Sequence, residues 1–228
     1  LESVRTFVCY PNLNVKFLSS HGGMTAAIDG VTHQATEDIG VMTTLPNMQV
    51  LVPADTQATR GCFDTAMESA GPVFVRLMRD PLFDLYQEGE TFPLGGSKCL
   101  REGSDVTIAT YGDLVFQALE AADALAEKGV SAEVLDMYSV KPFDREGLSR
   151  SLDKTGALVV VENHQRRNGL GYELGVYCAR EKCVPFDNLG LDNTFAESGD
   201  YYKLLEKYGV SAGHIVRVAG EVTARKKG

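Results

Sequence analysis

The sequence lacks the features that would assign it to a membrane or to nucleic acid. No run of apolar residues in the 228-residue chain reaches the length of a membrane-spanning helix, so we expect no membrane span. Basic residues are fewer than acidic ones, 22 against 31, and the formal net charge is −9. This charge argues against nucleic acid as a partner, because a phosphate backbone favours a basic surface. A phosphorylated small molecule is not excluded, since a few local cations are enough to bind it.

The cysteine pattern excludes further classes of protein. The five cysteines are odd in number and form no C-x-x-C pair, so a structural zinc site is not expected. We predict that this chain holds no metal by itself. We also predict that its thiols are reduced, as is usual in the cytosol, and that the protein is cytoplasmic.

Alternating strand and helix patterns predict an α/β protein with two doubly wound, mainly parallel-sheet domains. Apolar runs predict strands at residues 15–18, 49–52, 73–77, 106–110, 132–135 and 157–161. Helical patterns occupy residues 37–43, 56–69, 114–128, 148–154, 171–182, 201–208 and 211–224. Residues 81–102 gather Gly, Pro and acidic residues without periodicity. They indicate a linker between a domain at 1–80 and a domain at 103–228.

The most informative stretch is the loop at residues 20–34, which follows the strand predicted at 15–18. It contains two of the four histidines, His21 and His33, together with Asp29 and three glycines. Open α/β sheets bind ligands outside the carboxyl ends of their strands. Glycine lets the backbone approach a ligand closely, and histidine can carry a proton near neutral pH. We therefore predict a site for a hydroxylated, anionic small molecule here. The alternative is a tight turn with two solvated histidines.

Arg79 extends this predicted site. It lies at the end of the strand predicted at 73–77, and if the strands are parallel it emerges at the same edge of the sheet as His21. A guanidinium and an imidazole that converge there would bind phosphate. The alternative is a linker arginine paired with Asp80 or Asp84.

Two other strand ends carry candidates that we leave outside the predicted site. Gly112 follows the strand at 106–110, but no second or third glycine completes a dinucleotide-binding fingerprint, so an NAD or FAD site is disfavoured. Glu162 and His164 follow the strand at 157–161, where a ligand could bind. Surface polar residues at a strand end explain these two side chains equally well.

The His21 loop opens a series of short motifs that continues down the chain. The motifs are His21, Asp29-Gly30, Thr32-His33-Gln34, Glu37-Asp38, Leu45-Pro46-Asn47, Val52-Pro53-Ala54-Asp55, Phe195-Ala196-Glu197-Ser198-Gly199 and Glu206-Lys207-Tyr208-Gly209. In this order they resemble the pyrimidine-binding and C-terminal segments of the transketolase family. The resemblance runs from about residue 13 to the C-terminus and so covers nearly the whole chain.

The resemblance implies an activity and a role for each candidate residue. Transketolases use thiamine diphosphate to move a two-carbon ketol unit between phosphorylated sugars. By position in the motifs, Arg79 resembles the arginine that binds the substrate phosphate, and His21 resembles the histidine that contacts the substrate phosphate or hydroxyls. Asp29 resembles the acid that hydrogen-bonds a substrate hydroxyl, and His33 resembles the histidine beside the reacting carbon. The resemblance therefore implies that His33 and Asp29 are catalytic and that His21, Asp29 and Arg79 bind substrate.

Parts of the family's machinery are absent from these 228 residues. The Gly-Asp-Gly…Asn pattern that holds the diphosphate and its Mg²⁺ is not found. The cofactor-activating glutamate and the stacking aromatic residues precede the region that matches, so the cofactor-binding residues are unknown. We expect residues 1–80 to be a partial pyrimidine-binding domain and 103–228 to be a transketolase C-terminal-like domain. We also expect a partner subunit that carries the diphosphate-binding domain, self-association into a heterotetramer, and no activity from the isolated chain.

Other proteins that share this fold supply the alternatives. Deoxyxylulose-phosphate synthase and the β-type subunit of 2-oxoacid dehydrogenases are two of them. Thr-His-Gln followed by Leu-Pro-Asn and Pro-Ala-Asp favours transketolase or the synthase over the dehydrogenase subunit. A non-catalytic partner module of the same fold is a further alternative, and the retention of His21, Asp29 and His33 speaks against it.

Overall fold

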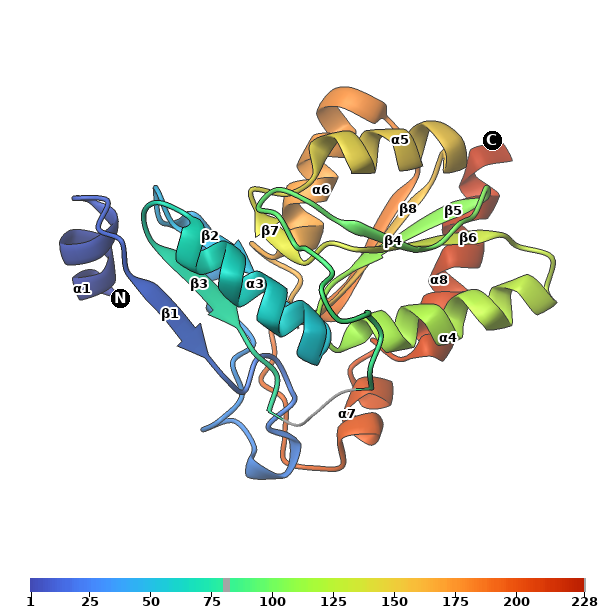
Figure 1. Cartoon of the computed structure of the whole chain (residues 1–228). Coiled ribbons are helices and arrows are strands. Elements are labelled where there is room, and N and C mark those ends of the chain that lie inside the picture. The colour runs from blue at the N-terminus through green and yellow to red at the C-terminus, as the bar shows by residue number, and fades with distance from the viewer. Residues whose placement is uncertain (80–82, 228) are drawn as a thin grey trace.

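The chain folds into two α/β lobes packed side by side (Figure 1), and the computed structural model describes residues 1–79 and 83–227. The first sheet has the order β1 (Lys16–Ser19), β3 (Val73–Arg76), β2 (Gln49–Leu51) and β7 (Ser139–Lys141). The second has the order β4 (Lys98–Arg101), β6 (Ala132–Asp136), β5 (Val106–Thr110), β8 (Leu158–Gln165) and β9 (Phe186–Leu191). Only β7 and β4, each at one edge of its sheet, run antiparallel to their neighbours. The predicted fold class is confirmed.

Helices cover the sheets as the alternating pattern predicts. The predicted helices are α2 (Asp38–Thr44), α3 (Thr56–Glu68), α4 (Leu114–Glu127), α5 (Arg145–Thr155), α6 (Leu170–Tyr177), α7 (Tyr201–Lys207) and α8 (Ala212–Ala224). One further short helix, α1 (Glu2–Val4), was not predicted. Short π-helical turns at Arg5–Cys9 and Cys178–Lys182 extend α1 and α6. In the second lobe, α4 and α8 lie together on one face of the sheet, and α5 and α6 lie on the other (Figure 1).

Capping residues set the helix boundaries. Asp55 precedes α3, and its Oδ1 accepts a hydrogen bond of 2.7 Å from the backbone N–H of Ala58. Asp144 caps α5 in the same way through Gly147 N–H. That helix ends at Gly156, whose left-handed φ of 64° is readily adopted only by glycine. The boundaries of α3 lie within one residue of the predicted 56–69, whereas α5, capped by Asp144, begins before the predicted start at residue 148.

Three strands were not predicted, and each has a physical reason. β4 lies inside the segment expected to be a linker at 81–102, so that expectation is wrong for residues 98–101. Only three residues form β7, and β9 carries Asp187, Asn188 and Gly190, residue types with low strand propensity. Pairing with a neighbouring strand stabilises these segments where their own composition does not.

One buried hydrophobic cluster spans both lobes. Val50 and Phe74 of the first sheet belong to the same buried cluster as Ala109, Leu135 and Val160 of the second sheet. In addition, β7 belongs to the first sheet although its sequence neighbours build the second lobe. The side chains at the junction of the lobes are therefore packed as in a protein interior, which fixes the loops of one lobe against the other.

Within residues 1–79 and 83–227, no helix combines the length and the apolar character that crossing a bilayer requires. All five cysteines are free thiols. Cys9, Cys62 and Cys178 are buried, whereas Cys99 and Cys183 are exposed.

Candidate functional site

The predicted site residues emerge from one edge of the first sheet. β1 and β3 are parallel neighbours, so the loop that follows β1 and the segment that follows β3 leave the sheet side by side. Backbone hydrogen bonds continue this pairing past the strands, from Leu77 N to Ser19 O at 2.7 Å and from Gly22 N to Leu77 O at 3.0 Å. The backbone N–H of Arg79 then donates to Thr25 Oγ1 at 3.3 Å. The predicted common edge for His21 and Arg79 is thus observed.

The four predicted side chains lie in two neighbouring pairs, Arg79 with Asp29 and His21 with His33. Arg79 Nε lies 3.3 Å from Asp29 Oδ2, and both side chains are 32% exposed. The rings of His21 and His33 lie with their centroids 6.3 Å apart and their planes tilted by 49°. Asp80, one of the alternative partners considered for Arg79, lies outside the described residues. A cation, an acid and two imidazoles therefore share one solvent-accessible loop cluster.

A neighbouring hydroxyl holds each of the two imidazoles. Ser20 Oγ lies 2.8 Å from Nδ1 of His21, and Thr32 Oγ1 lies 2.9 Å from Nδ1 of His33. Because a hydroxyl can donate or accept, either tautomer is compatible with this contact. In both residues the contact occupies Nδ1 and leaves Nε2 as the nitrogen that can meet a ligand. His21 also has a positive φ of 67°, an uncommon conformation for a residue with a side chain.

A buried arginine lies beneath the loop, and the sequence analysis missed it. Arg76 is fully buried in β3, where its Nε donates to Asp38 Oδ2 at 2.9 Å. Its Nη2 donates to the main-chain oxygens of Ala35 and Asn163, each at 2.9 Å. A buried charge has to be paired, and these bonds fix the returning arm of the site loop to the sheet. The signal available in the sequence was an arginine at the end of the otherwise apolar run Val73–Val75.

Segment 195–199 of the second lobe covers the other side of the loop. The backbone N–H of Gly199 donates to Ala27 O at 3.2 Å, and Gln34 Nε2 donates to Glu197 O at 3.2 Å. A methyl group added at Gly30 would lie 2.1 Å from Ser198 Oγ, so the two segments are in direct contact. Two of the motifs recognised far apart in the sequence therefore form one structural unit.

Glu162 and His164 are structural in this fold, and the expectation that they are surface polar residues is wrong. Glu162 is fully buried and accepts hydrogen bonds from the Tyr111 hydroxyl and from Leu170 N and Gly171 N, which caps α6. Burial raises the pKa of its carboxyl. His164 is also buried.

Both ring nitrogens of His164 have partners. Its Nε2 accepts from Gly40 N at 3.1 Å, and its Nδ1 lies 2.7 Å from Gln165 O. Leaving both residues outside the predicted site agrees with these contacts, because their polar atoms are used within the fold.

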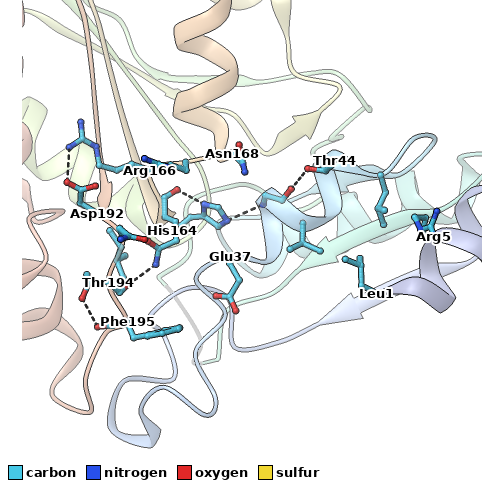
Figure 2. Close-up of a pocket in the computed structure, with 17 residues that line it drawn as sticks. Leu1, Arg5, Glu37, Thr44, His164, Arg166, Asn168, Asp192, Thr194 and Phe195 are labelled. Carbon is cyan, nitrogen blue, oxygen red and sulfur yellow. Dashed lines mark hydrogen bonds and ion pairs between the residues drawn. The ribbon is translucent and has the colours of Figure 1, made fainter.

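A cavity of about 660 Å³ lies at the carboxyl ends of β8 and β9 (Figure 2). Two of the arginines that line it have acidic neighbours: Arg166 Nη1 lies 4.0 Å from Asp192 Oδ2, and Arg5 Nη2 lies 3.6 Å from Glu2 Oε1. None of the four predicted site residues is among the described residues that line it. The cavity is therefore distinct from the site formed by the four predicted residues.

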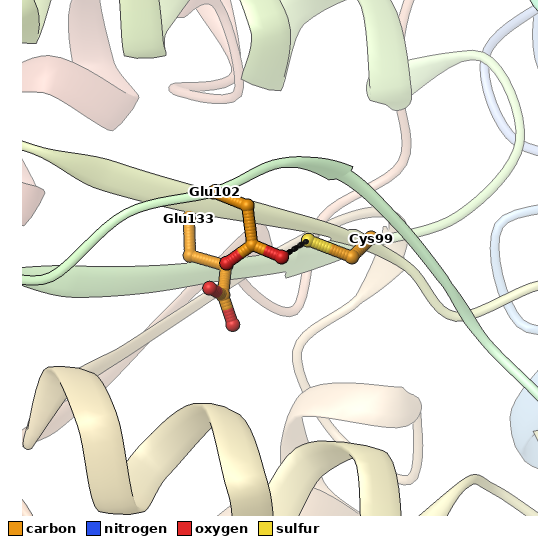
Figure 3. A group of neighbouring side chains, drawn as sticks. All are labelled: Cys99, Glu102 and Glu133. Atoms are coloured by element: carbon orange, nitrogen blue, oxygen red, sulfur yellow. Dashed lines mark hydrogen bonds between the residues drawn. The ribbon is translucent and has the colours of Figure 1, made fainter.

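One cluster has the composition of a metal site. Cys99, Glu102 and Glu133 place a sulfur and two carboxylate oxygens within 4.8 Å of one another (Figure 3). Lys154 Nζ, however, contacts both glutamates, so an ammonium group already occupies the space between the carboxylates. Among the described residues this is the only such group, and its charge balance gives no support to a bound cation.

Comparisons with known proteins agree with this arrangement. The family models described as the transketolase pyrimidine binding domain and the transketolase C-terminal domain match residues 2–83 and 95–215. The chain is 43% identical to a 6-deoxy-6-sulfo-D-fructose transketolase subunit of Clostridium sp. (strain MSTE9), over 99% of this chain and 70% of that protein. It is 37% identical to a putative transketolase C-terminal section of Methanocaldococcus jannaschii, over 95% of this chain and 68% of that protein.

A solved structure gives the same result for the fold. The chain superimposes on a split-gene transketolase, an inactive β4 tetramer, with a TM-score of 0.91 and 40% sequence identity. The match covers 98% of this chain and 71% of that one. The resemblance found in the motifs is confirmed.

Proposed function

This chain belongs to the transketolase family, and we propose that it is the C-terminal subunit or section of a transketolase. The proposed reaction moves a two-carbon ketol unit between phosphorylated sugars. The observation that carries the proposal is the convergence of His21, Asp29, His33 and Arg79 at one edge of the first sheet. These are the residue types that a hydroxylated anion requires.

We assign the terminal anion of the sugar to Arg79 and His21. A guanidinium offers paired donors that match the geometry of phosphate, and the exposed Nε2 of His21 can add a further donor. A relative that shares 43% identity is named for a sugar that ends in a sulfonate, another tetrahedral anion. The same two side chains suit both groups.

We assign the reacting end of the sugar to His33 and Asp29. The Asp29 carboxylate, held by Arg79, can accept a hydrogen bond from a sugar hydroxyl and so select its configuration. The His33 Nε2, left open by the contact of Nδ1 with Thr32, can take up or deliver a proton on a substrate oxygen. The 6.3 Å between the two imidazoles leaves room for a substrate that touches both rings.

The described residues fit the sugar better than they fit the diphosphate end of the cofactor. Thiamine diphosphate would supply the nucleophilic carbon of a transketolase reaction. Its diphosphate and Mg²⁺ require several oxygen ligands and backbone N–H groups. In the parts of the chain that the structure describes, the only group of three or more His, Cys, Asp or Glu side chains close enough to share a metal ion is the one that Lys154 contacts. We therefore place the diphosphate and Mg²⁺ on a partner chain or domain.

This division of ligands supports a partner and an assembly. We propose that the chain pairs with an N-terminal transketolase subunit that carries the diphosphate-binding domain, and that the pair associates further into a heterotetramer. The exposed apolar side chains Ile28 and Val31 in the site loop and Phe195 beside it suit contact with such a partner. A related split-gene transketolase forms a tetramer of one subunit and is inactive in that form. We expect the isolated chain to behave in the same way.

Reconstitution tests the proposal. The chain and the diphosphate-binding subunit of the same organism are assayed separately and together, with thiamine diphosphate and Mg²⁺, for ketol transfer from fructose 6-phosphate to an aldose phosphate. We expect activity only from the mixture. Transfer from 6-deoxy-6-sulfofructose in a parallel assay separates sulfonate from phosphate preference. Condensation of pyruvate with glyceraldehyde 3-phosphate, without ketol transfer, would instead support a deoxyxylulose-phosphate synthase.

A further inference from the structure

The second lobe uses the place where a doubly wound sheet normally binds its ligand to hold the site loop. β6 and β8 lie on opposite sides of β5, so the strand order reverses at β5. The crevice outside the carboxyl ends of β5 and β8 is the usual ligand position in such sheets. Here the backbone N–H of Met24, in the site loop, donates at 2.8 Å to Oδ1 of Asn163, near the end of β8. A segment of the first lobe thus fills the crevice.

Asn163 makes hydrogen bonds to residues of both lobes. Its Oδ1 accepts from Met24 N, its Nδ2 donates to Asp113 Oδ2 at 2.9 Å, and its main-chain oxygen accepts from Arg76 Nη2 at 2.9 Å. Asn163 is completely buried, and Asp113, which follows β5, is 4% exposed. Protein groups from both lobes therefore hold this residue.

Asp113 decides which way the amide points. An ionised carboxylate only accepts hydrogen bonds, so it selects the NH₂ side of Asn163 and directs the oxygen to Met24. The hydroxyl of Tyr201 donates to the same Oδ2. Burial raises the pKa of Asp113 to about 6, with Arg76 and the Asn163 amide acting in the opposite direction, so the group is ionised above neutral pH. Tyr111, Glu162 and Asp38 are the other titratable groups in this buried cluster.

The glycines that follow His21 let the site loop approach Asn163 closely. Gly23 has a φ of +62°, and a Cβ there would lie 2.3 Å from Asn163 Cγ. Its backbone exchanges hydrogen bonds of 2.7 and 3.1 Å with Ala35, which lies on the returning arm of the loop. The arm that carries His21 and the arm that carries His33 are therefore tied to each other at the point that Asn163 holds.

We propose that Asn163, oriented by Asp113, is a positioning residue that sets the His21 and His33 imidazoles to face one substrate. The consequence for catalysis rests on the proposed function, whereas the placement of the two rings does not. The second lobe thereby affects the catalytic side chains without touching substrate. The crevice outside the carboxyl ends of β5 and β8 holds the loop instead of a ligand.

A charge exchange between the two side chains tests the proposal. In Asn163→Asp, measured well above neutral pH so that the pair does not keep a shared proton, two carboxylates face each other, and their repulsion displaces the loop. In Asp113→Asn, the side chain at position 113 can donate as well as accept, so it no longer selects one orientation of the Asn163 amide. In the double variant, the carboxylate introduced at position 163 can accept from Met24 N and from the amide introduced at position 113, while the Tyr201 hydroxyl changes from donor to acceptor. The original contacts are then restored with the charges exchanged.

Two measurements report the result. The first is the position of the His21 and His33 ring signals in the NMR spectrum of the chain, with His214 as the internal reference. The second is kcat and KM for ketol transfer in the reconstituted complex. A misplaced reacting group costs about 10²-fold, so we expect kcat to fall by about that factor in each single variant, with a smaller change in KM. The double variant should recover most of the loss and return the ring signals.

Ser151→Ala is the matched control. It removes a buried hydroxyl that lies 2.6 Å from Thr107 Oγ1 in the same lobe, away from the loop. It should lower Tm without moving the histidine signals. Unmoved ring signals in folded single variants, a kcat loss that follows Tm in all variants, or no recovery in the double variant would each overturn the proposal. Ring signals that move and recover, while the wild-type complex transfers no ketol, would overturn the proposed function and leave the positioning role standing. If Asn163→Asp does not fold, Asp113→Asn carries the same test.

Discussion

Arg79 Nε lies 3.3 Å from Asp29 Oδ2, so the cation and the acid of the candidate site are also each other's partners. The two residues come from different segments and meet because β1 and β3 run parallel. Each holds the other in place before substrate arrives, which reduces the ordering cost of binding. A change in either residue therefore alters the placement of the other.

Arg79→Ala should mainly weaken the binding of sugars that end in an anion. A hydrogen bond to a charged group contributes about 1.5–3 kcal/mol, and because the anion lies away from the reacting carbon, the loss should appear largely in KM. His21→Ala should act in the same direction. Steady-state kinetics of the reconstituted complex with phosphorylated and unphosphorylated sugars measure the effect. Arg217→Ala, which removes an exposed arginine on α8, is the control. Equal losses for both kinds of sugar would rule out the assignment.

Asp29→Asn should relax the selection of the sugar's hydroxyl configuration. The carboxylate accepts a hydrogen bond from a hydroxyl in one orientation, and a site built for such a bond disfavours the wrong epimer. We expect the ratio of kcat/KM between the two epimers of the donor to fall by about tenfold or more. The ratio is compared with that of the wild-type complex at the same pH. An unchanged ratio would show that Asp29 does not contact the hydroxyl.

Arg76→Met should strongly lower the free energy of unfolding, and this effect can be measured in the absence of substrate. The substitution removes the cation that pairs with Asp38. Among the described residues, Oδ1 of Asp38 is buried without a hydrogen bond, so the carboxylate has no second partner to compensate for the loss. Breaking a buried pair costs about 3–5 kcal/mol, whereas replacing both partners by apolar groups is often neutral. Urea unfolding of Arg76→Met and of the double variant Arg76→Met with Asp38→Leu measures the two cases. A double variant no more stable than the single one would contradict this explanation.

Asp136→Asn should change how stability depends on pH. Burial raises the pKa of Asp136 from 3.8 to about 7, and the hydrogen bond of 2.6 Å from the Tyr86 hydroxyl only partly opposes this. The folded protein thus keeps a proton that the unfolded chain has lost between about pH 4 and about pH 7. Wild-type stability loses this contribution as pH rises through that window.

The variant has no such proton to lose. As pH rises, the difference in free energy of unfolding between the variant and wild type should therefore change in favour of the variant by up to about 1.4 kcal/mol per pH unit. Urea unfolding at a series of pH values from about 5 to about 8 measures the difference, which should level off above the folded-state pKa of about 7. A difference that does not change with pH would show that Asp136 does not titrate in this range.

The site loop and the mainly parallel sheets could be predicted from the sequence because both depend on local signals. The apolar run before His21, the glycines after it and the Asp55 cap of α3 specify their structure without distant contacts. The support beneath the loop could not be predicted in the same way. Arg76 and Asn163 lie far apart in the chain, and although each is an unusual residue for a buried strand, nothing local in the sequence shows which group it contacts. Their roles follow only from the packing of one lobe on the other.

The kcat of His33→Ala in the reconstituted complex tests the central claim most directly. His33 is the side chain placed beside the reacting carbon, and a proton-transfer role contributes about 10²–10⁴-fold. Saturating donor and acceptor sugars remove effects on binding, and His214→Ala, on α8, serves as the histidine control. We predict a fall of kcat in that range with Tm unchanged, since the exposed His33 side chain adds little packing. A kcat equal to that of the control, or a loss that matches the unfolded fraction, would contradict the claim that this loop carries the chemistry.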